Sequence, residues 1–289
     1  MTERNVYGKK SYEYALGRLY ATNHRILSAE QLGRLREADL QTAEKLLTEY
    51  GYPAVAKGQT VYDAIEAEKN AVCAFLREIA PDEALAALLF FEEDALNLKY
   101  LWKSKRIGKP LDTAVLCEGS FDRELLRICV ETETYSLLGD ELDHALTAIE
   151  KETDPCRISC LIDNAVFAYA VSAAQKLHCK ALVRLFSVYG AGKNRLTAAR
   201  LHALGFAPAE YAFAFLPAAM PAEADANTDA MTIAEETEAA LESVLQDLGY
   251  ADGIGVLAQY YFRKKAEAAA LRLLFTQKAN LHERQVDAV

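Results

Sequence analysis

The 289-residue sequence lacks a basic excess, an apolar run long enough to cross a bilayer, and an apolar leader. Its net charge is −10 and it has no basic stripe, which argues against binding to nucleic acid. The longest apolar stretches, 165–174 and 209–220, fall short of the roughly 18 residues of a spanning helix. The first residues show no signal core. We therefore expect a soluble, cytoplasmic chain whose contact with any membrane passes through a partner.

Residue sets that would catalyse a reaction or hold a cofactor are also scarce. The five histidines lie in helical stretches without a matching serine or cysteine nucleophile. The segment Gly190-Ala191-Gly192-Lys193 lacks the spacing and the following Ser or Thr of a phosphate-binding loop. Cys156 and Cys160, with His178-Cys179 downstream, match zinc spacing poorly, and buried reduced thiols are the better interpretation of the six cysteines. We expect no catalytic residues, no cofactor and no metal.

Helix signals are what the sequence does contain. Apolar residues recur at spacings of three and four, and no stretch alternates apolar and polar residues as a strand would. Ser28-x-x-Gln31 and Thr232-x-x-Glu235 match the capping box, Thr60 opens a further segment, and all seven prolines fall at predicted boundaries. The sequence predicts an all-α fold, with a break or kink at 190–192. The longer expected helices cover 40–50, 60–79, 81–106, 123–138, 141–152, 155–189, 194–204, 234–248 and 256–279.

One segment, Asp94-Ala95-Leu96-Asn97-Leu98-Lys99, is echoed twice downstream. A shift of 97 (191 − 94) pairs Asn97 with Asn194 and Lys103 with Arg200, and a shift of 173 (267 − 94) pairs Asp94 with Glu267 and Lys99 with Arg272. A degenerate helical repeat indicates an assembled body of related units rather than one catalytic pocket.

The repeated helix supports two interpretations. Lys99, Lys103 and Arg106 lie at i, i+4 and i+7 and form a basic ridge, which predicts docking to an acidic or carbonyl-rich partner surface. In the alternative interpretation, these lysines pair with local acids on a solvated face, where each pair contributes about 0–1 kcal/mol. Asn97 is a poor helix former, and its echo at Asn194 suggests a polar pairing inside each helical unit.

The residues 90–105 resemble a D-x-x-N-L-K-x-L-x-K-x-K segment of the C-subunit family of bacterial and archaeal V-type (A-type) ATPases, whose eukaryotic relative is the d subunit. Further stretches are similar to the same family at low identity over most of the chain: 12–20, 27–52, Ile162-Asp163-Asn164 with Tyr169, and Lys264-Lys265-Ala266-Glu267 with Leu271-Arg272. The chain departs from the pattern at Ala191, Ala270 and Arg195-Leu196, which implies weaker or different contacts for the second and third copies.

The resemblance implies a non-catalytic rotor part. The family is expected to fold as three similar helical lobes about a pseudo-threefold axis, here 1–117, 118–220 and 221–289, with residues 7–20 packing near the third lobe. The chain would sit peripherally on the cytoplasmic face of the membrane, as a socket between the membrane rotor ring of proteolipid subunits and the central-stalk subunits D and F. It would serve ATP-driven H⁺ or Na⁺ transport, or ATP synthesis. The residues expected to contact ring or stalk are Asp94, Asn97, Lys99, Lys103, Arg106, Asn194, Arg200 and Arg272.

Two other functions remain open at this point. An all-α isoprenoid-synthase-like enzyme would hold Mg²⁺ on paired carboxylates, for which Asp140-Glu141-Leu142-Asp143 is the nearest match and Glu92-Glu93-Asp94 a poorer one. A generic helical-repeat scaffold of the tetratricopeptide kind would recur at about 34 residues. The echoes here are 97 and 76 apart (173 − 97 = 76), and that mismatch counts against it.

Overall fold

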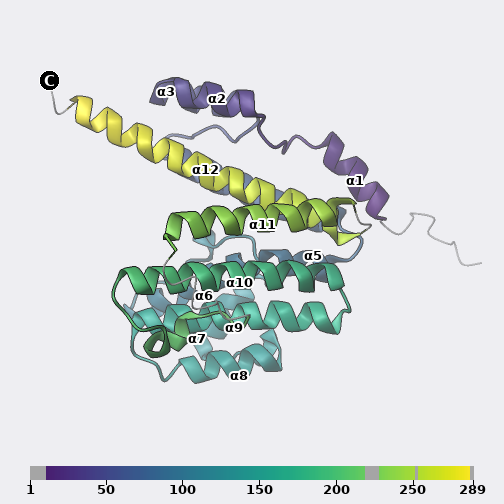
Figure 1. Cartoon of the computed structure of the whole chain (residues 1–289), viewed down its shortest axis with the longest axis vertical. Coiled ribbons are helices and arrows are strands. Elements are labelled where there is room, and N and C mark those ends of the chain that lie inside the picture. Colours follow the sequence, from purple (N-terminus) through teal and green to yellow (C-terminus); the bar gives the residue numbers. More distant parts are fainter. Residues whose placement is uncertain (1–10, 219–227, 251–252, 287–289) are drawn as a thin grey trace, which may run out of the picture. The chain divides into compact units, whose positions relative to one another are not determined.

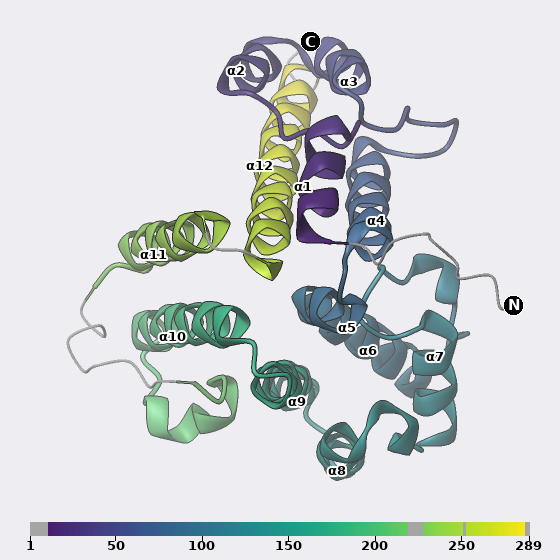
Figure 2. The same ribbon diagram turned by 90° about the vertical axis from the view of Figure 1, so that its right-hand side faces the viewer.

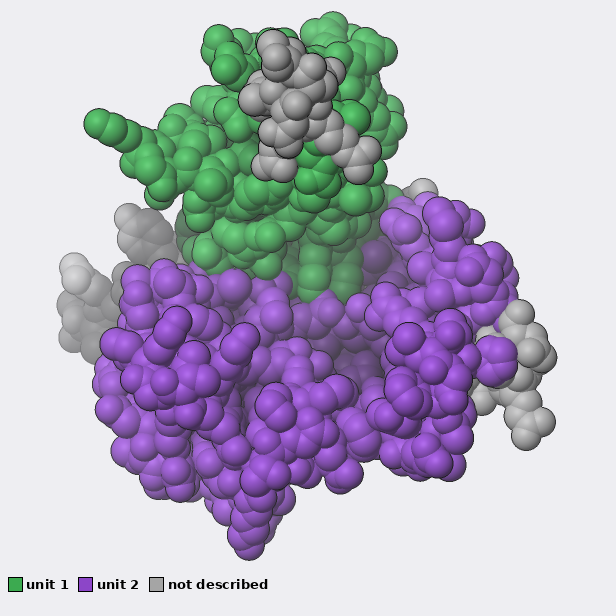
Figure 3. Space-filling model, turned by 90° about the vertical axis from the view of Figure 1, so that its left-hand side faces the viewer, with its two compact units in different colours: residues 1–81, 259–289 green, residues 82–258 purple. Residues whose placement is uncertain are grey.

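The computed structural model describes residues 11–218, 228–250 and 253–286. Within these ranges every regular element is a helix, which confirms the all-α prediction. The chain divides into two compact units: residues 1–81 with 259–289, and residues 82–258 (Figure 3). The three-lobe division and its boundaries stay a prediction, and the parts of it that fall on residues 1–10, 219–227, 251–252 and 287–289 lie outside the described residues.

The first unit joins the beginning of the chain to its last helix. Its elements are α1 (Tyr12–Ala21), α2 (Ala29–Glu37), α3 (Leu40–Glu49), α4 (Val61–Ile79) and most of α12 (Ile254–Val286). The predicted capping box at Ser28 is present, with Gln31 as its partner, and Thr60 caps α4 with Asp63. Side chains from α2, α3, α4, α12 and the segments next to α2 and α3 share one core: Leu27, Leu35, Ala43, Leu47, Tyr52, Val61, Ile65, Ala268, Leu271 and Phe275.

The second unit is built from consecutive helices, α5 to α11 (Figure 1). Its α-helices are α5 (Glu83–Ala87), α6 (Phe91–Arg106), α7 (Arg123–Thr132), α8 (Asp140–Ile149), α9 (Pro155–Lys176), α10 (Lys180–Ala203) and α11 (Ala230–Tyr250). Short 3₁₀ turns lie at η1 (Leu88–Phe90), η2 (Thr113–Val115), η3 (Ser136–Leu138) and η4 (Pro208–Ala214). Helix α9 packs against α6, α8 and α10, and α11 lies along α10 (Figure 2).

The predicted boundaries around the glycine pair were wrong. The expected break at 190–192 is absent, because α10 is continuous from Lys180 to Ala203. The glycines permit close packing instead: a Cβ at Gly190 would lie 2.8 Å from a ring carbon of Phe167, and one at Gly192 would lie 2.2 Å from Thr237. The helical run is interrupted earlier instead. His178, which lies between α9 and α10, has a positive φ of 54°.

Two helix ends differ from prediction for local reasons. The helix expected over 123–138 ends at Thr132, because Glu133 takes the left-handed conformation, and a 3₁₀ turn follows. Helix α11 begins at Ala230, before the expected Thr232, since the carboxylate of Asp229 accepts the backbone N–H groups of Met231 and Thr232.

Helix α9 is the one helix among the described residues that is long and apolar enough to cross a membrane, with a mean hydropathy of 1.2 in its best window. The three helices packed against it belong to the same unit. Its Asp163 also pairs with Lys99 of α6, with 2.6 Å between Oδ1 and Nζ. These contacts are typical of a core helix.

Candidate functional site: three helices that hold extended backbone

Helix α6 holds a neighbouring extended segment through two buried side chains, which we call the first clasp (Asp94 and Asn97). The Asn97 amide donates to the carbonyl of Cys117 at 2.9 Å and accepts the Cys117 N–H at 2.8 Å. The Asp94 carboxylate accepts the N–H groups of Ser120, at 2.9 Å, and Phe121, at 3.2 Å. Spacing of i and i+3 places both side chains on one face of the helix. The clasp supplies hydrogen-bond partners to the backbone of a segment that is itself not helical.

The first clasp requires a glycine in the segment that it holds. A Cβ at Gly119 would lie 2.0 Å from Oδ1 of Asp94, so any side chain there would displace the carboxylate. Only 1% of Asp94 and 2% of Asn97 are exposed, so both groups face the interior of the second unit.

Helix α10 repeats half of this arrangement in the second clasp (Asn194). The Asn194 amide donates to the carbonyl of Leu216 at 3.0 Å and accepts the Leu216 N–H at 2.8 Å. Ala191 stands where α6 carries Asp94, so the carboxylate is missing from this copy. The residue two positions beyond the held residue also changes, from Gly119 to Ala218. Its methyl group packs where Gly190 leaves room.

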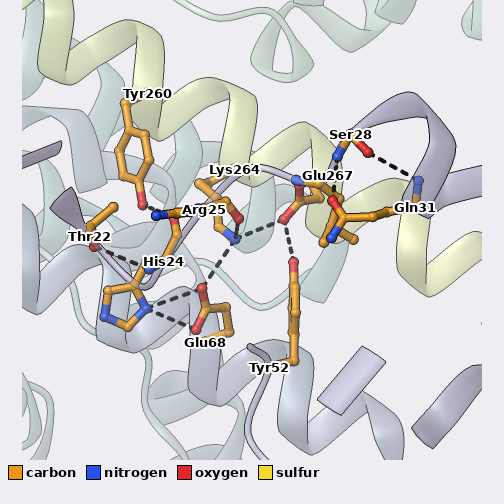
Figure 4. Close-up of polar contacts among 11 residues, drawn as sticks. Thr22, His24, Arg25, Ser28, Gln31, Tyr52, Glu68, Tyr260, Lys264 and Glu267 are labelled. Atoms are coloured by element: carbon orange, nitrogen blue, oxygen red, sulfur yellow. Dashed lines mark hydrogen bonds and ion pairs between the residues drawn. The ribbon is translucent and has the colours of Figure 1, made fainter. Parts of the chain in front are cut away.

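Helix α12 holds the chain that follows α1 through the third clasp (Lys264 and Glu267), shown in Figure 4. The Glu267 carboxylate accepts the N–H of Leu27 and the hydroxyl of Tyr52, the latter at 2.5 Å. Lys264 donates to the carbonyl of Arg25 at 3.2 Å and to Glu267 at 2.8 Å. In this clasp, charged side chains hold the backbone, as the asparagine amides do in the second unit.

The third clasp continues into a buried charge cluster. Nζ of Lys264 lies 3.1 Å from Glu68 of α4, and Nδ1 of His24 lies 3.1 Å from the other oxygen of the same carboxylate (Figure 4). Glu68, Lys264 and Glu267 are each at most 5% exposed. Burial, followed by the charge of Glu267, raises the pKa of Tyr52, so its hydroxyl stays protonated and donates. The cluster ties α4 and α12 to the segment 24–27 between them.

The cluster partners Tyr52, His24 and Glu68 were not among the predicted site residues. Glu267 aligns with Asp94 at the shift of 173, so the repeat itself could have identified it. The identity of the segment that it holds has no local signal, since Leu27 is 240 residues away in sequence.

The eight predicted residues fall into three groups by burial and by the contacts that they make. Asp94, Asn97 and Asn194 are buried in the clasps. Lys99 pairs with Asp163, Arg106 donates to the carbonyl of Glu150 at 3.3 Å, and Arg272 pairs with Glu66. Lys103 and Arg200 are exposed on α6 and α10. Internal ties therefore account for the polar contacts of six positions, and partner contact at all eight stays a prediction.

The exposed face of α6 combines apolar and basic character. Leu96, Tyr100 and Ile107 are 49%, 38% and 57% exposed, and with Lys103 they occupy i, i+4, i+7 and i+11 of one stripe. At the end of α10, Arg200 is followed four residues later by Leu204, which is 69% exposed. In both helices this basic–apolar pair precedes a left-handed glycine, at Gly108 and Gly205. We call these two pairs, with Leu96 and Tyr100, the basic–apolar surface; it consists of two exposed stretches, one on α6 and one on α10.

No group of three or more His, Cys, Asp or Glu side chains that could hold a metal ion occurs among the residues that the structure describes. The acids expected to bind Mg²⁺ in the enzyme alternative, 140–143, form the first turn of α8. Acidic side chains favour that position through the helix dipole.

The family model of the ATP synthase (C/AC39) subunit matches residues 15–252 of this chain. The chain belongs to this family. Family membership confirms the resemblance seen in the repeated segment, and with it the interpretation of the chain as a structural, non-catalytic subunit. It also agrees with a peripheral rather than integral position relative to the membrane.

Two curated relatives are named as the C subunit of a V-type ATP synthase, and they come from two strains of Thermus thermophilus. Each is 28% identical to this member of the ATP synthase (C/AC39) family over 185 residues, which cover 59% of the chain and 57% of the relative. The matched region thus spans little more than half the length of these relatives.

Proposed function

We propose that the chain is a central-stalk subunit of a V-type ATPase or ATP synthase. It would act as the socket that couples the membrane rotor ring to the stalk subunits D and F, on the cytoplasmic face of the membrane. The family match over residues 15–252 is the observation that carries this proposal. Coupled to ATP hydrolysis, the complex would move H⁺ or Na⁺; run in reverse, it would make ATP.

The clasps support a mechanical role. A part that transmits torque must resist deformation, and close-packed helices are stiff. In each clasp, buried side-chain bonds fix a segment that has no helical bonds of its own. The segments that link helices are then held as firmly as the helices themselves, which suits a coupling between two moving parts.

The basic–apolar surface supports a docking role. Lys103 and Arg200 are exposed cations beside exposed apolar side chains, and apolar patches with a polar rim are typical of partner interfaces. Complementary charge on the partner would orient the docking, and burial of Ile107 and Leu204 would contribute affinity. Asp94, Asn97 and Asn194 would hold this surface in shape from within.

The test is co-purification of ring and stalk subunits with the tagged full chain from membranes. The double variant Lys103→Glu/Arg200→Glu should lose no more than about 2 kcal/mol of unfolding free energy, because each charge lies in the last turn of its helix, and it should lose ring or stalk subunits from the eluate. Lys99 stays unchanged in this design, because its reversal would also break the pair with Asp163.

The matched control is Lys45→Glu/Lys57→Glu, which reverses two exposed lysines of the first unit and makes the same change in net charge. It should retain the partners. Equal loss in both double variants would reject the basic–apolar surface as the docking site. Isolation of the wild-type chain from membranes without any ring or stalk subunit would reject the proposed function itself.

A further inference from the structure

Two cysteines lie one turn apart at the start of α9, away from the clasps. Asp154 caps the helix and accepts the Cys156 N–H at 2.9 Å, which fixes Cys156 in the first turn. Cys156 is exposed and Cys160 is half-buried. Because they stand at i and i+4 of α9, their side chains lie on the same face of the helix, one turn apart. The two sulfurs therefore form one accessible dithiol.

The spacing of this dithiol suits a bridging atom better than a disulfide. Side chains at i and i+4 of a regular helix have Cβ atoms about 5–6 Å apart, whereas a disulfide requires about 3.5–4.5 Å. A direct S–S bond would need the first turns of α9 to distort. An atom bonded to both sulfurs fills the extra distance and leaves the helix intact.

The surroundings restrict which atom can bridge. The described residues offer no third His, Cys, Asp or Glu ligand in a group that could hold a metal, and structural zinc needs four ligands. Burial, and then the neighbouring Cys156, raises the pKa of the Cys160 thiol to about 11, so it keeps its proton at neutral pH. Asp163 also raises this pKa and Lys99 lowers it. The site therefore favours a ligand with a soft, electrophilic atom that can bond to both sulfurs and can react with thiols that carry their protons.

We propose that Cys156 and Cys160 form a binding site for trivalent arsenicals. An arsenoxide, R–As=O, condenses with the two thiols to give R–As(S–Cys)₂ and one water. Two As–S bonds form, the As=O bond and two S–H bonds break, and the oxygen leaves with both thiol protons. No oxidant or reductant takes part, because arsenic stays trivalent. The site involves none of the residues of the clasps or of the basic–apolar surface, so it is independent of the proposed function.

The experiment uses the reduced full-length chain and phenylarsine oxide, with intact-mass measurement of the product. The wild type should gain one phenylarsenic group less two hydrogens. A small dithiol such as 2,3-dimercaptopropanol should reverse the adduct, while an equal amount of monothiol should not. Cys156→Ser and Cys160→Ser should each bind at least about tenfold more weakly, because the second sulfur acts at a high effective concentration.

Cys179→Ser is the matched control, since Cys179 is a partly exposed cysteine just before α10. It should bind like the wild type. Thermal melting of each variant separates loss of the site from loss of the fold. Wild-type binding by either Cys156→Ser or Cys160→Ser, or loss of binding in Cys179→Ser alone, would overturn the proposal.

Discussion

The clasps on α6 and α10 share one amide and differ in what surrounds it. Asn97 and Asn194 make the same pair of bonds to a segment 20 and 22 residues further along. An asparagine amide can donate and accept at once, as a peptide group does, so one side chain serves both groups of the residue it holds. Helix α6 adds a carboxylate, which needs Gly119 opposite it, whereas α10 has Ala191 and tolerates Ala218. The amide is the common requirement, and the carboxylate is an addition that the held segment must accommodate.

The first unit meets the same requirement with charge. Glu267 can only accept and Lys264 can only donate, so two side chains replace one amide. Their burial brings in Glu68, His24 and Tyr52 as further partners. The third clasp should therefore be the most sensitive of the three to the loss of one member.

The largest expected effect is at Lys264. Lys264→Met leaves the carboxylates of Glu68 and Glu267 buried without their shared cation, which should cost about 3–5 kcal/mol of unfolding free energy. Urea unfolding measures it, and Lys57→Met, at an exposed lysine of the same unit, should change stability by less than about 0.5 kcal/mol. Similar costs for the two variants would show that the buried cluster contributes little.

The amide comparison comes next. Asn97→Ala and Asn194→Ala each leave a buried backbone N–H and carbonyl without a side-chain partner, for an expected cost of about 2–4 kcal/mol. Because the bonds are the same, the two costs should agree within about 1 kcal/mol despite the different surroundings. Equilibrium unfolding in urea provides both values. A much smaller cost for Asn97→Ala would mean that Asp94 holds the segment alone.

A smaller effect tests the fit between Asp94 and Gly119. Gly119→Ala should cost about 1–3 kcal/mol by displacing the carboxylate from its two N–H donors. In an Asp94→Ala background the same change should cost at least about 1 kcal/mol less, which a double-mutant cycle measures. Gly33→Ala, where a Cβ meets no atom within 4 Å, should be neutral or stabilising. Additive costs would contradict direct contact.

The last effect is a pH dependence in α12, which is small for each unit of pH. Nζ of Lys265 is buried, and burial followed by the charge of Lys69 lowers its pKa to about 7. In the unfolded chain its pKa is about 10.4. Between these values the unfolded state binds a proton that the folded state lacks, so this lysine makes stability rise with pH, by at most about 1.4 kcal/mol per unit. Lys265→Met should therefore flatten the curve of unfolding free energy between pH 7 and 9, while Lys57→Met should keep the rise. Parallel curves for all three proteins would exclude this titration.

The sequence predicted the fold class, and it singled out Asp94 and Asn97 as a polar pair on one helix face, because those features depend on local signals. Capping boxes, prolines and the three-to-four spacing lie within a turn or two of the helices that they specify. The echo of Asn97 at Asn194 also indicated a polar pairing inside each unit. The structure adds what that amide pairs with, the backbone of Cys117 and of Leu216.

The wrong and missing predictions concern features that depend on contacts between distant parts of the chain. A glycine pair such as Gly190 and Gly192 is compatible with a break or with close packing, and the choice depends on Phe167 and Thr237 on other helices. The segment held by Glu267 could not be identified for the same reason. Contacts between distant parts of the chain decide these cases, and a single sequence does not display them.

The third clasp also sets an order of assembly. The backbone groups of His24, Arg25 and Leu27 find their partners on α12, more than 230 residues later, so the core shared by α2, α3, α4 and α12 cannot close until α12 has left the ribosome. The second unit, 82–258, is synthesised in one continuous stretch and can fold before then. Folding would therefore begin in the middle of the chain, and residues 24–27 would take their final place only after α12 has been made.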